Sequence, residues 1–168
     1  HLSIRRQRQM CIRDRHEEEC SDHLAVLLQA AAPEIAFDPE FHVGGNREVD
    51  IACSVGNLRI PIEAKGQWNK DLWSAAQWQL GDQQAVDHKA NGCGVYLVYW
   101  FGSNGKSLAK PPAGVLRPTT PDDLQYLLSQ MLTAAGRHNL KVVVLDLVRP
   151  AQMLSLIHIS EPTRQAEI

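Results

Sequence analysis

Asp50, Glu63 and Lys65 are the residues whose chemical types and spacing first suggest a reaction. The dipeptide Gly56-Asn57 separates two alternating apolar and polar stretches and predicts a two-residue hairpin turn with glycine at its first central position. This turn sets the register, so Asp50 is predicted to lie opposite Glu63, and Glu48 opposite Lys65. Opposed Cβ atoms in a hairpin lie roughly 4.5–5.5 Å apart. Two carboxylates held this close repel each other unless a cation lies between them, which predicts a divalent metal site.

The same hairpin is predicted to have one apolar face and one polar face, because side chains alternate along a strand. Asp50, Glu63 and Lys65 share the polar face. The apolar face is formed by Val49, Ile51, Cys53, Val55, Leu58, Ile60, Ile62 and Ala64. The ordinary alternative is an amphipathic hairpin with a surface salt bridge between Lys65 and Glu48 or Asp50, worth only about 0.2–1 kcal/mol.

Asp50 followed on the next strand by Glu63-Ala64-Lys65 resembles the PD-(D/E)XK nuclease superfamily, with Val49 in place of the proline. The resemblance implies a Mg²⁺ ion, with Mn²⁺ as the alternative, held by Asp50, Glu63 and the backbone carbonyl of Ala64. It also implies that Lys65 stabilises developing charge, or positions a water and helps to deprotonate it. Two neighbouring carboxylates favour the charged form of Lys65, which supports the electrostatic role.

The order of predicted elements agrees with this resemblance. We predict an α/β fold in which helices flank a mixed central sheet, with the restriction endonuclease-like αβββαβ core and one further helix and strand. The predicted helices span residues 17–32, 70–88 and 121–135, and the first carries an apolar stripe of Leu24, Leu27, Leu28 and Ala31 at helical spacing. The predicted strands span 35–43, 47–55, 58–65, 95–101 and 141–148, and the last of them is expected to be buried.

Two of the predicted helices carry further site candidates. Superfamily members often direct a glutamine of the helix after the Glu-x-Lys strand at the site, and this implies a catalytic role for Gln79, with Gln83 as the second choice. The resemblance also implies an acidic residue from the first helix. Glu17, Glu18 and Glu19 all remain open for that role, and a solvated charge cluster is the alternative for each.

Three tryptophans, Trp68, Trp73 and Trp78, lie around the start of the predicted helix 70–88. Aromatic rings can stack on unpaired bases. Tryptophans at helical spacing more often pack against a core, and we favour packing for these three.

Both ends of the chain read as translated adapter DNA rather than protein. The codons CAG ATG TGT ATA AGA GAC encode residues 9–14. Extended by AG, the reverse complement of this DNA begins CTG TCT CTT ATA CAC ATC, which encodes residues 154–159. We therefore interpret residues 1–15 and 154–168 as adapter-like artefacts. Residues 16–153 are predicted to be a PD-(D/E)XK nuclease-like domain, a metagenomic fragment of a larger bacterial protein. A basic, nucleic-acid-binding N-terminal tail is the alternative for the first segment.

The charge of residues 16–153 bears on the partners. This segment holds 11 basic and 16 acidic residues, a net charge of −5, which argues against a free-standing, basic DNA-binding module. Other domains of the parent protein are then expected to deliver the nucleic acid, while Arg47, Lys65 and Lys70 line a groove. The cysteines show neither zinc spacing nor a disulfide framework, and no apolar run reaches membrane-spanning length, so we expect a cytoplasmic protein without a membrane partner.

These observations together predict a Mg²⁺-dependent endonuclease domain that hydrolyses phosphodiester bonds of DNA. We expect it to be the effector part of a larger bacterial protein, with defence proteins and NTPases as candidate parents. One alternative is a catalytically inactive nuclease fold that serves as a binding or regulatory module. The other is an unrelated interaction domain, which a structure with Asp50 and Glu63 on opposite faces would favour.

Overall fold

The computed structural model describes residues 17–43, 47–76, 78, 89–103 and 106–148. Its helices and strands follow the predicted order. They are α2 (Glu17–Ala31), β1 (Ala36–Val43), β2 (Arg47–Val55), β3 (Leu58–Gly66), β4 (Gly94–Trp100), α3 (Pro121–Ala134) and β5 (Leu140–Asp146).

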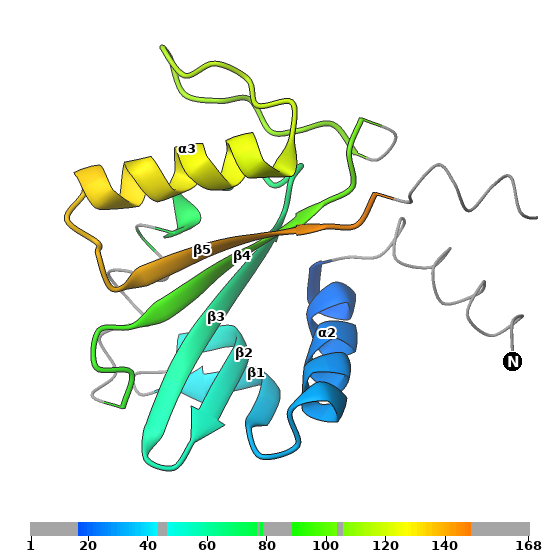
Figure 1. Cartoon of the computed structure of the whole chain (residues 1–168), viewed down its shortest axis with the longest axis vertical. Helices are drawn as coiled ribbons and strands as arrows, with labels where there is room; N and C mark the ends of the chain where they lie inside the picture. The colour runs from blue at the N-terminus through cyan, green and yellow to red at the C-terminus, as the bar shows by residue number, and fades with distance from the viewer. Residues whose placement is uncertain (1–16, 44–46, 77, 79–88, 104–105, 149–168) are drawn as a thin grey trace, which may run out of the picture.

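One mixed sheet with the strand order β1-β2-β3-β4-β5 forms the centre of the fold. The pairs β1–β2 and β2–β3 are antiparallel, whereas β3–β4 and β4–β5 are parallel. Figure 1 shows α2 against one face of this sheet and α3 against the other. The predicted α/β class, a mixed central sheet flanked by helices, is therefore confirmed.

The β2–β3 hairpin has the predicted register. Its ladder runs from Val55 opposite Leu58 to Ile51 opposite Ile62, and Gly56 has a φ of +56°, as the first central position of a type II′ turn requires. The predicted pair of Glu48 with Lys65 lies beyond this ladder. On its other side, β2 pairs with β1, where Glu48 lies opposite His42.

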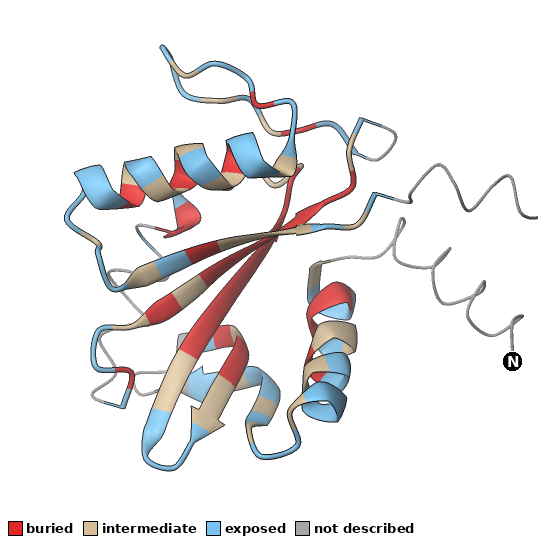
Figure 2. Cartoon of the chain, in the orientation of Figure 1, coloured by how far each residue is buried: buried red, intermediate tan, exposed pale blue. Residues whose placement is uncertain are grey.

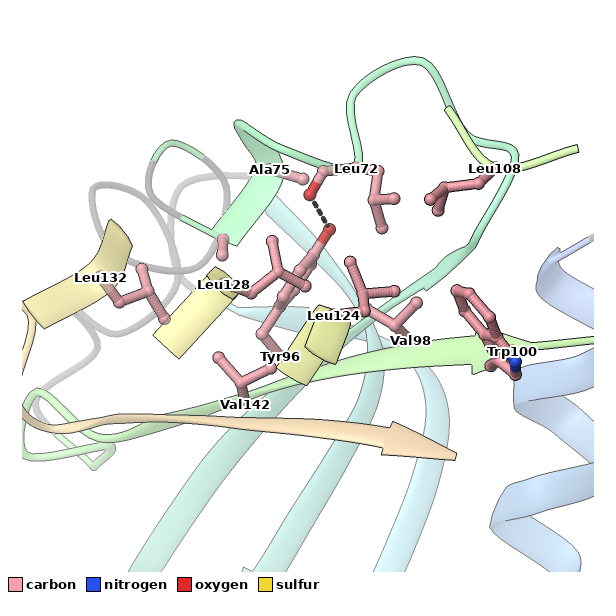
Figure 3. Packing of buried hydrophobic residues seen from close by; sticks show 11 residues of the cluster. Leu72, Ala75, Tyr96, Val98, Trp100, Leu108, Leu124, Leu128, Leu132 and Val142 are labelled. Carbon is pink, nitrogen blue, oxygen red and sulfur yellow. Dashed lines mark hydrogen bonds between the residues drawn. The ribbon is translucent and has the colours of Figure 1, made fainter. Parts of the chain in front are cut away.

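The two faces of the sheet bury separate hydrophobic clusters. Figure 2 shows that the central strands β3 and β4 are buried along most of their length. On the α2 face, Cys20 and Ala25 of the helix pack against Ile51, Ile62, Ala64, Leu97 and Tyr99 of the sheet. On the α3 face, the cluster includes Leu124, Leu128 and Leu132 from the helix and Tyr96, Val98, Trp100 and Val142 from the sheet (Figure 3). The Tyr96 hydroxyl donates a 2.7 Å hydrogen bond to the Leu72 carbonyl, which ties the segment after β3 to this face.

α3 begins as its sequence predicts. Thr120 is the N-cap, and its side chain accepts a hydrogen bond from the Asp123 backbone N–H while the Asp123 carboxylate accepts one from the Thr120 N–H. Pro121 occupies the first turn, where no backbone N–H is needed. This capping box fixes the residue at which α3 begins. Because β4 and β5 are parallel, α3 runs back across the sheet and its first turn lies near the carboxyl end of β4.

Three structural predictions need correction. The predicted apolar stripe of the first helix included Leu27 and Ala31, but both are exposed, and α2 instead packs through Cys20, Ser21 and Ala25. The strand after α3 was predicted to be buried, but β5 lies at the sheet edge and only Val142 within it is fully buried.

The third correction concerns the predicted helix 70–88. Residues 70–74 form tight turns, and helical geometry begins only at Ala75. The Asn69 side chain accepts a 2.9 Å hydrogen bond from the Asp71 backbone N–H. An N-cap residue makes this bond to the second residue of a helix. The Leu72 and Ser74 N–H groups, however, bond three residues back, to the Asn69 and Asp71 carbonyls, so this turn is tighter than an α-helix. Residues 77 and 79–88 lie outside the described residues.

Within the described ranges, no helix combines the length and the apolar character that are needed to cross a membrane.

Candidate active site

The structure brings Asp50, Glu63 and Lys65 together at the end of the β2–β3 ladder. The Lys65 ammonium nitrogen lies 2.5 Å from Glu63 Oε1 and 3.8 Å from Asp50 Oδ2. Glu63 and Lys65 share one face because they are two residues apart on β3. Asp50 is the first residue of β2 beyond the paired part of the hairpin. The two acids thus flank one cation, and the arrangement with acids on opposite faces does not occur.

Asp50 also binds the backbone of β3. The Ala64 N–H donates a 2.7 Å hydrogen bond to Asp50 Oδ2, so a side chain replaces the next backbone partner at the point where the ladder ends. The N–H and C=O of one strand residue point to the same side. The Ala64 carbonyl therefore faces the β2 side as well, toward Asp50, where the resemblance implies a metal ligand.

The polar face of the hairpin is buried rather than solvated. Glu63 is 3% exposed and Lys65 is 9% exposed, and Glu63 is paired in register with the fully buried Tyr96 of β4. A surface salt bridge, the ordinary alternative for this hairpin, is therefore not what the chain forms. A buried ion pair has a large desolvation cost that only good geometry and further hydrogen bonds can offset.

Burial and charge shift the pKa values of two groups in this cluster. Burial, with the Glu63 carboxylate and the more distant Glu17, raises the pKa of Asp50 to about 6, although Lys65 and the Ala64 N–H act in the opposite direction. Burial lowers the pKa of Lys65, but Glu63 and Asp50 more than offset this, so its pKa lies above the usual value. At neutral pH, Lys65 is therefore a charged group rather than a proton acceptor.

Asp50→Asn is expected to stabilise the metal-free protein at neutral pH. The native state binds the Asp50 proton more tightly than the unfolded chain does, because the pKa is about 6 against an ordinary value of 3.8. The contribution of Asp50 to the free energy of unfolding therefore falls as the pH rises from about 4 to about 6. Removing this titration is expected to raise the free energy of unfolding by about 1–3 kcal/mol at pH 8, with the gain disappearing below pH ~4.

Denaturant unfolding in EDTA between pH 4 and pH 8 measures this effect. Asp71→Asn, which removes an exposed carboxylate in the turn after β3, is the matched control and should change stability by less than about 0.5 kcal/mol at each pH. A constant difference between wild type and Asp50→Asn across the pH range would contradict the raised pKa.

Glu17 is the acid of the first helix that reaches the sheet. Its carboxylate accepts hydrogen bonds of 2.8 Å from the Gly66 backbone N–H and from the Asn69 side chain, so α2 begins next to the carboxyl end of β3. Glu18 and Glu19 are exposed. Of the three acids left open by the sequence, Glu17 therefore contributes negative charge closest to Asp50 and Lys65.

Other predicted site features have mixed outcomes. Gln79 and Gln83 lie outside the described residues, so the predicted role of the helix glutamine stays a prediction. Trp68 and Trp73 are partly buried and pack against the two clusters, whereas Trp78 is 62% exposed. Across the described residues, no three His, Cys, Asp or Glu side chains gather closely enough to hold one metal ion.

Gln67 is a residue near the site that sequence reasoning missed. It is 2% exposed, and its side-chain oxygen accepts a 2.7 Å hydrogen bond from the Phe101 backbone N–H. Its side-chain nitrogen donates to the carbonyls of Gly102 and Lys106, at 3.0 and 2.6 Å. The available signal is its position two residues after Lys65, directly after the last residue of β3.

Comparisons with known proteins give one match. A family model described as a domain of unknown function (DUF8371) matches residues 7–103. This range begins within residues 1–15, which we interpret as adapter-like, includes Asp50, Glu63 and Lys65, and ends just after β4. No curated protein and no solved structure matches the chain.

Proposed function

The chain belongs to this family, whose description assigns no activity, and we propose that it is a metal-dependent nuclease domain that hydrolyses phosphodiester bonds of DNA. The observation that carries the proposal is the group formed by the buried Glu63 and Lys65 and the half-buried Asp50 at the end of a hairpin ladder. A fold alone needs no such group, because well-packed apolar side chains stabilise a sheet as well or better. An effector role in a larger cytoplasmic bacterial protein is part of the proposal.

The donor atoms present fit a hard divalent cation such as Mg²⁺, or Mn²⁺ in its place. Mg²⁺ binds through one or two carboxylates and keeps several waters, so it does not require three acidic side chains. Asp50 and Glu63 would hold it together with the Ala64 carbonyl. Burial and the Glu63 carboxylate raise the pKa of Asp50 by more than Lys65 lowers it, and a bound cation would favour the ionised form of Asp50. Bound there, the ion would supply charge to the phosphoryl oxygens and lower the pKa of water.

The chain's own groups would bind and orient the substrate around these acids. Lys65 is held by Glu63, is charged at neutral pH and lies in a water-poor site. A fixed ammonium in such a site stabilises negative charge that develops on a phosphoryl oxygen more strongly than it would in water. Gln79 would orient the attacking water or the scissile phosphate. General-base chemistry by Lys65 is disfavoured, since its pKa lies above the usual value.

Cleavage of plasmid DNA in Mg²⁺, compared with EDTA, tests the proposal. Asp50→Asn is expected to lower the cleavage rate at least about tenfold while making the metal-free protein more stable, because it removes one charged ligand of the ion. Asp71→Asn is the control and should cleave like wild type. Equal cleavage by wild type and Asp50→Asn, or cleavage in EDTA, would exclude the assigned site.

The acidic charge of the segment favours a second candidate. Residues 16–153 carry a net charge of −5, which suits a nuclease-like fold that has lost catalysis and serves as a binding or regulatory module. Calorimetry with Mg²⁺ separates the two candidates. A nuclease domain must bind the ion in a way that Asp50→Asn weakens, whereas an inert module has no need to retain it.

A further inference from the structure

A cavity of about 500 Å³ lies beyond the carboxyl ends of β3 and β4. Gln67, two residues after Lys65, forms part of its wall, and Trp100 and Gly102 at the end of β4 form another part. Pro118 and Thr119, just before α3, also line it. Ligands of open α/β sheets bind outside the carboxyl ends of the parallel strands, which is where this cavity lies.

The lining divides into an apolar floor and a polar rim. Trp100, Leu108 and Pro118 are buried and form the floor, and Trp100 and Leu108 lie at the same end of the α3-side cluster in Figure 3. The exposed Ser103 and Ser107 contribute hydroxyl groups to the rim. A floor that accepts a ring or sugar, combined with donors at the rim, is typical of small-molecule sites of this size.

Arg117 supplies the positive charge of the cavity. One nitrogen of its guanidinium donates a 3.1 Å hydrogen bond to the Leu108 carbonyl, which holds the group at the rim. Guanidinium has five N–H donors in a planar fork that matches a phosphate. The hydroxyl of Thr119 is less available, since it lies 3.3 Å from the Asp123 carboxylate of the α3 capping box.

The charge of the surrounding segment differs from that of the rest of the chain. Residues 102–119 contain three basic residues, Lys106, Lys110 and Arg117, and no acidic residue, although residues 16–153 have a net charge of −5. The Lys106 ammonium lies 4.4 Å from the centre of the Trp68 ring, and the Lys106 carbonyl is held by Gln67. The segment thus carries positive charge in an otherwise acidic chain, which favours an anionic ligand at the cavity.

We infer that this cavity binds one nucleotide unit, with the phosphate on Arg117 and Ser107 and the nucleoside over Trp100 and Leu108. The cavity is too large for a phosphate alone and is of the size that holds small organic ligands. The choice of a nucleotide rests on the proposed function, because Gln67 in the cavity wall directly follows β3, the strand that carries Glu63 and Lys65. A nucleotide within a bound DNA strand and a free nucleotide would both present this phosphate and nucleoside.

Calorimetry on the full chain in EDTA tests the inference without any cleavage. The probes are thymidine 5′-monophosphate, thymidine and a ten-residue oligothymidylate. We expect the monophosphate to bind at least about tenfold more tightly than thymidine, and Arg117→Ala and Ser107→Asp each to weaken it at least about tenfold. Lys110→Ala, which removes a charge from the same segment outside the cavity lining, is the control and should bind within about twofold of wild type.

The outcomes separate the two possible ligands and the two proposals. Tighter binding of the oligonucleotide than of the monophosphate assigns the cavity to a strand, and equal or weaker binding assigns it to a free nucleotide. No binding of the monophosphate at millimolar concentration, or unchanged binding by both Arg117→Ala and Ser107→Asp, would overturn the inference. These titrations need no metal, so their result does not depend on whether the protein cleaves DNA. Ser107 is exposed, so Ser107→Asp is expected to leave the fold intact.

Discussion

Lys65→Met is expected to abolish DNA cleavage and also to lower the stability of the fold. Removing a fixed charge that stabilises a transition state costs roughly 10²–10³ in rate. The variant also withdraws the ammonium from the buried Glu63 carboxylate, and breaking a buried ion pair on one side costs about 3–5 kcal/mol of unfolding free energy. Plasmid cleavage in Mg²⁺ and denaturant unfolding measure the two effects.

A double variant separates the catalytic loss from the structural one. Glu63→Gln combined with Lys65→Met removes both charges and leaves side chains of similar volume, so its unfolding free energy should return to within about 1–2 kcal/mol of wild type. Its cleavage should stay at the background level. Lys141→Ala, an exposed cation near the start of the edge strand β5, is the control for cleavage. A stable double variant that still cuts DNA would show that these residues serve only the fold.

The sequence predicts the hairpin and its acidic group well because their determinants are local. Gly56 adopts the positive φ that a two-residue turn needs, and the alternation of side chains then fixes the face of every residue up to the end of the ladder. The same reasoning could not show that the polar face is buried. That property comes from Tyr96 of β4 and from the segment after β3, which are brought there by the tertiary fold.

Other features depend on contacts that no local pattern encodes. The apolar periodicity of α2 indicates a helix but not which part of its apolar surface meets the sheet, and Leu27 remains 53% exposed. The buried side is instead marked by Ser21, whose hydroxyl lies 3.2 Å from the Tyr99 hydroxyl of β4. A serine that pairs with a tyrosine 78 residues away cannot be recognised from neighbouring residues.

Gln67 is another residue whose role depends on partners that are distant in the sequence. Gln67→Ala is expected to lower the free energy of unfolding by about 2–4 kcal/mol, because it leaves the buried Phe101 N–H without its side-chain partner and opens a cavity. The two carbonyls that Gln67 binds, 35 and 39 residues away, would also lose their donor. Denaturant unfolding measures the loss.

The matched control is Gln125→Ala. The Gln125 side-chain oxygen accepts a 2.9 Å hydrogen bond from the Val144 backbone N–H at the sheet edge. This bond is half-buried, and its loss is expected to cost only about 1 kcal/mol. Gln67→Glu gives a sharper comparison, since an ionised carboxylate accepts from Phe101 but repels the carbonyls of Gly102 and Lys106. Its stability should therefore fall as the pH rises through the pKa of the new acid. If Gln67→Ala and Gln125→Ala cost the same, Gln67 does not organise the segment that carries Arg117, and the cavity beside the acidic group is held by other contacts.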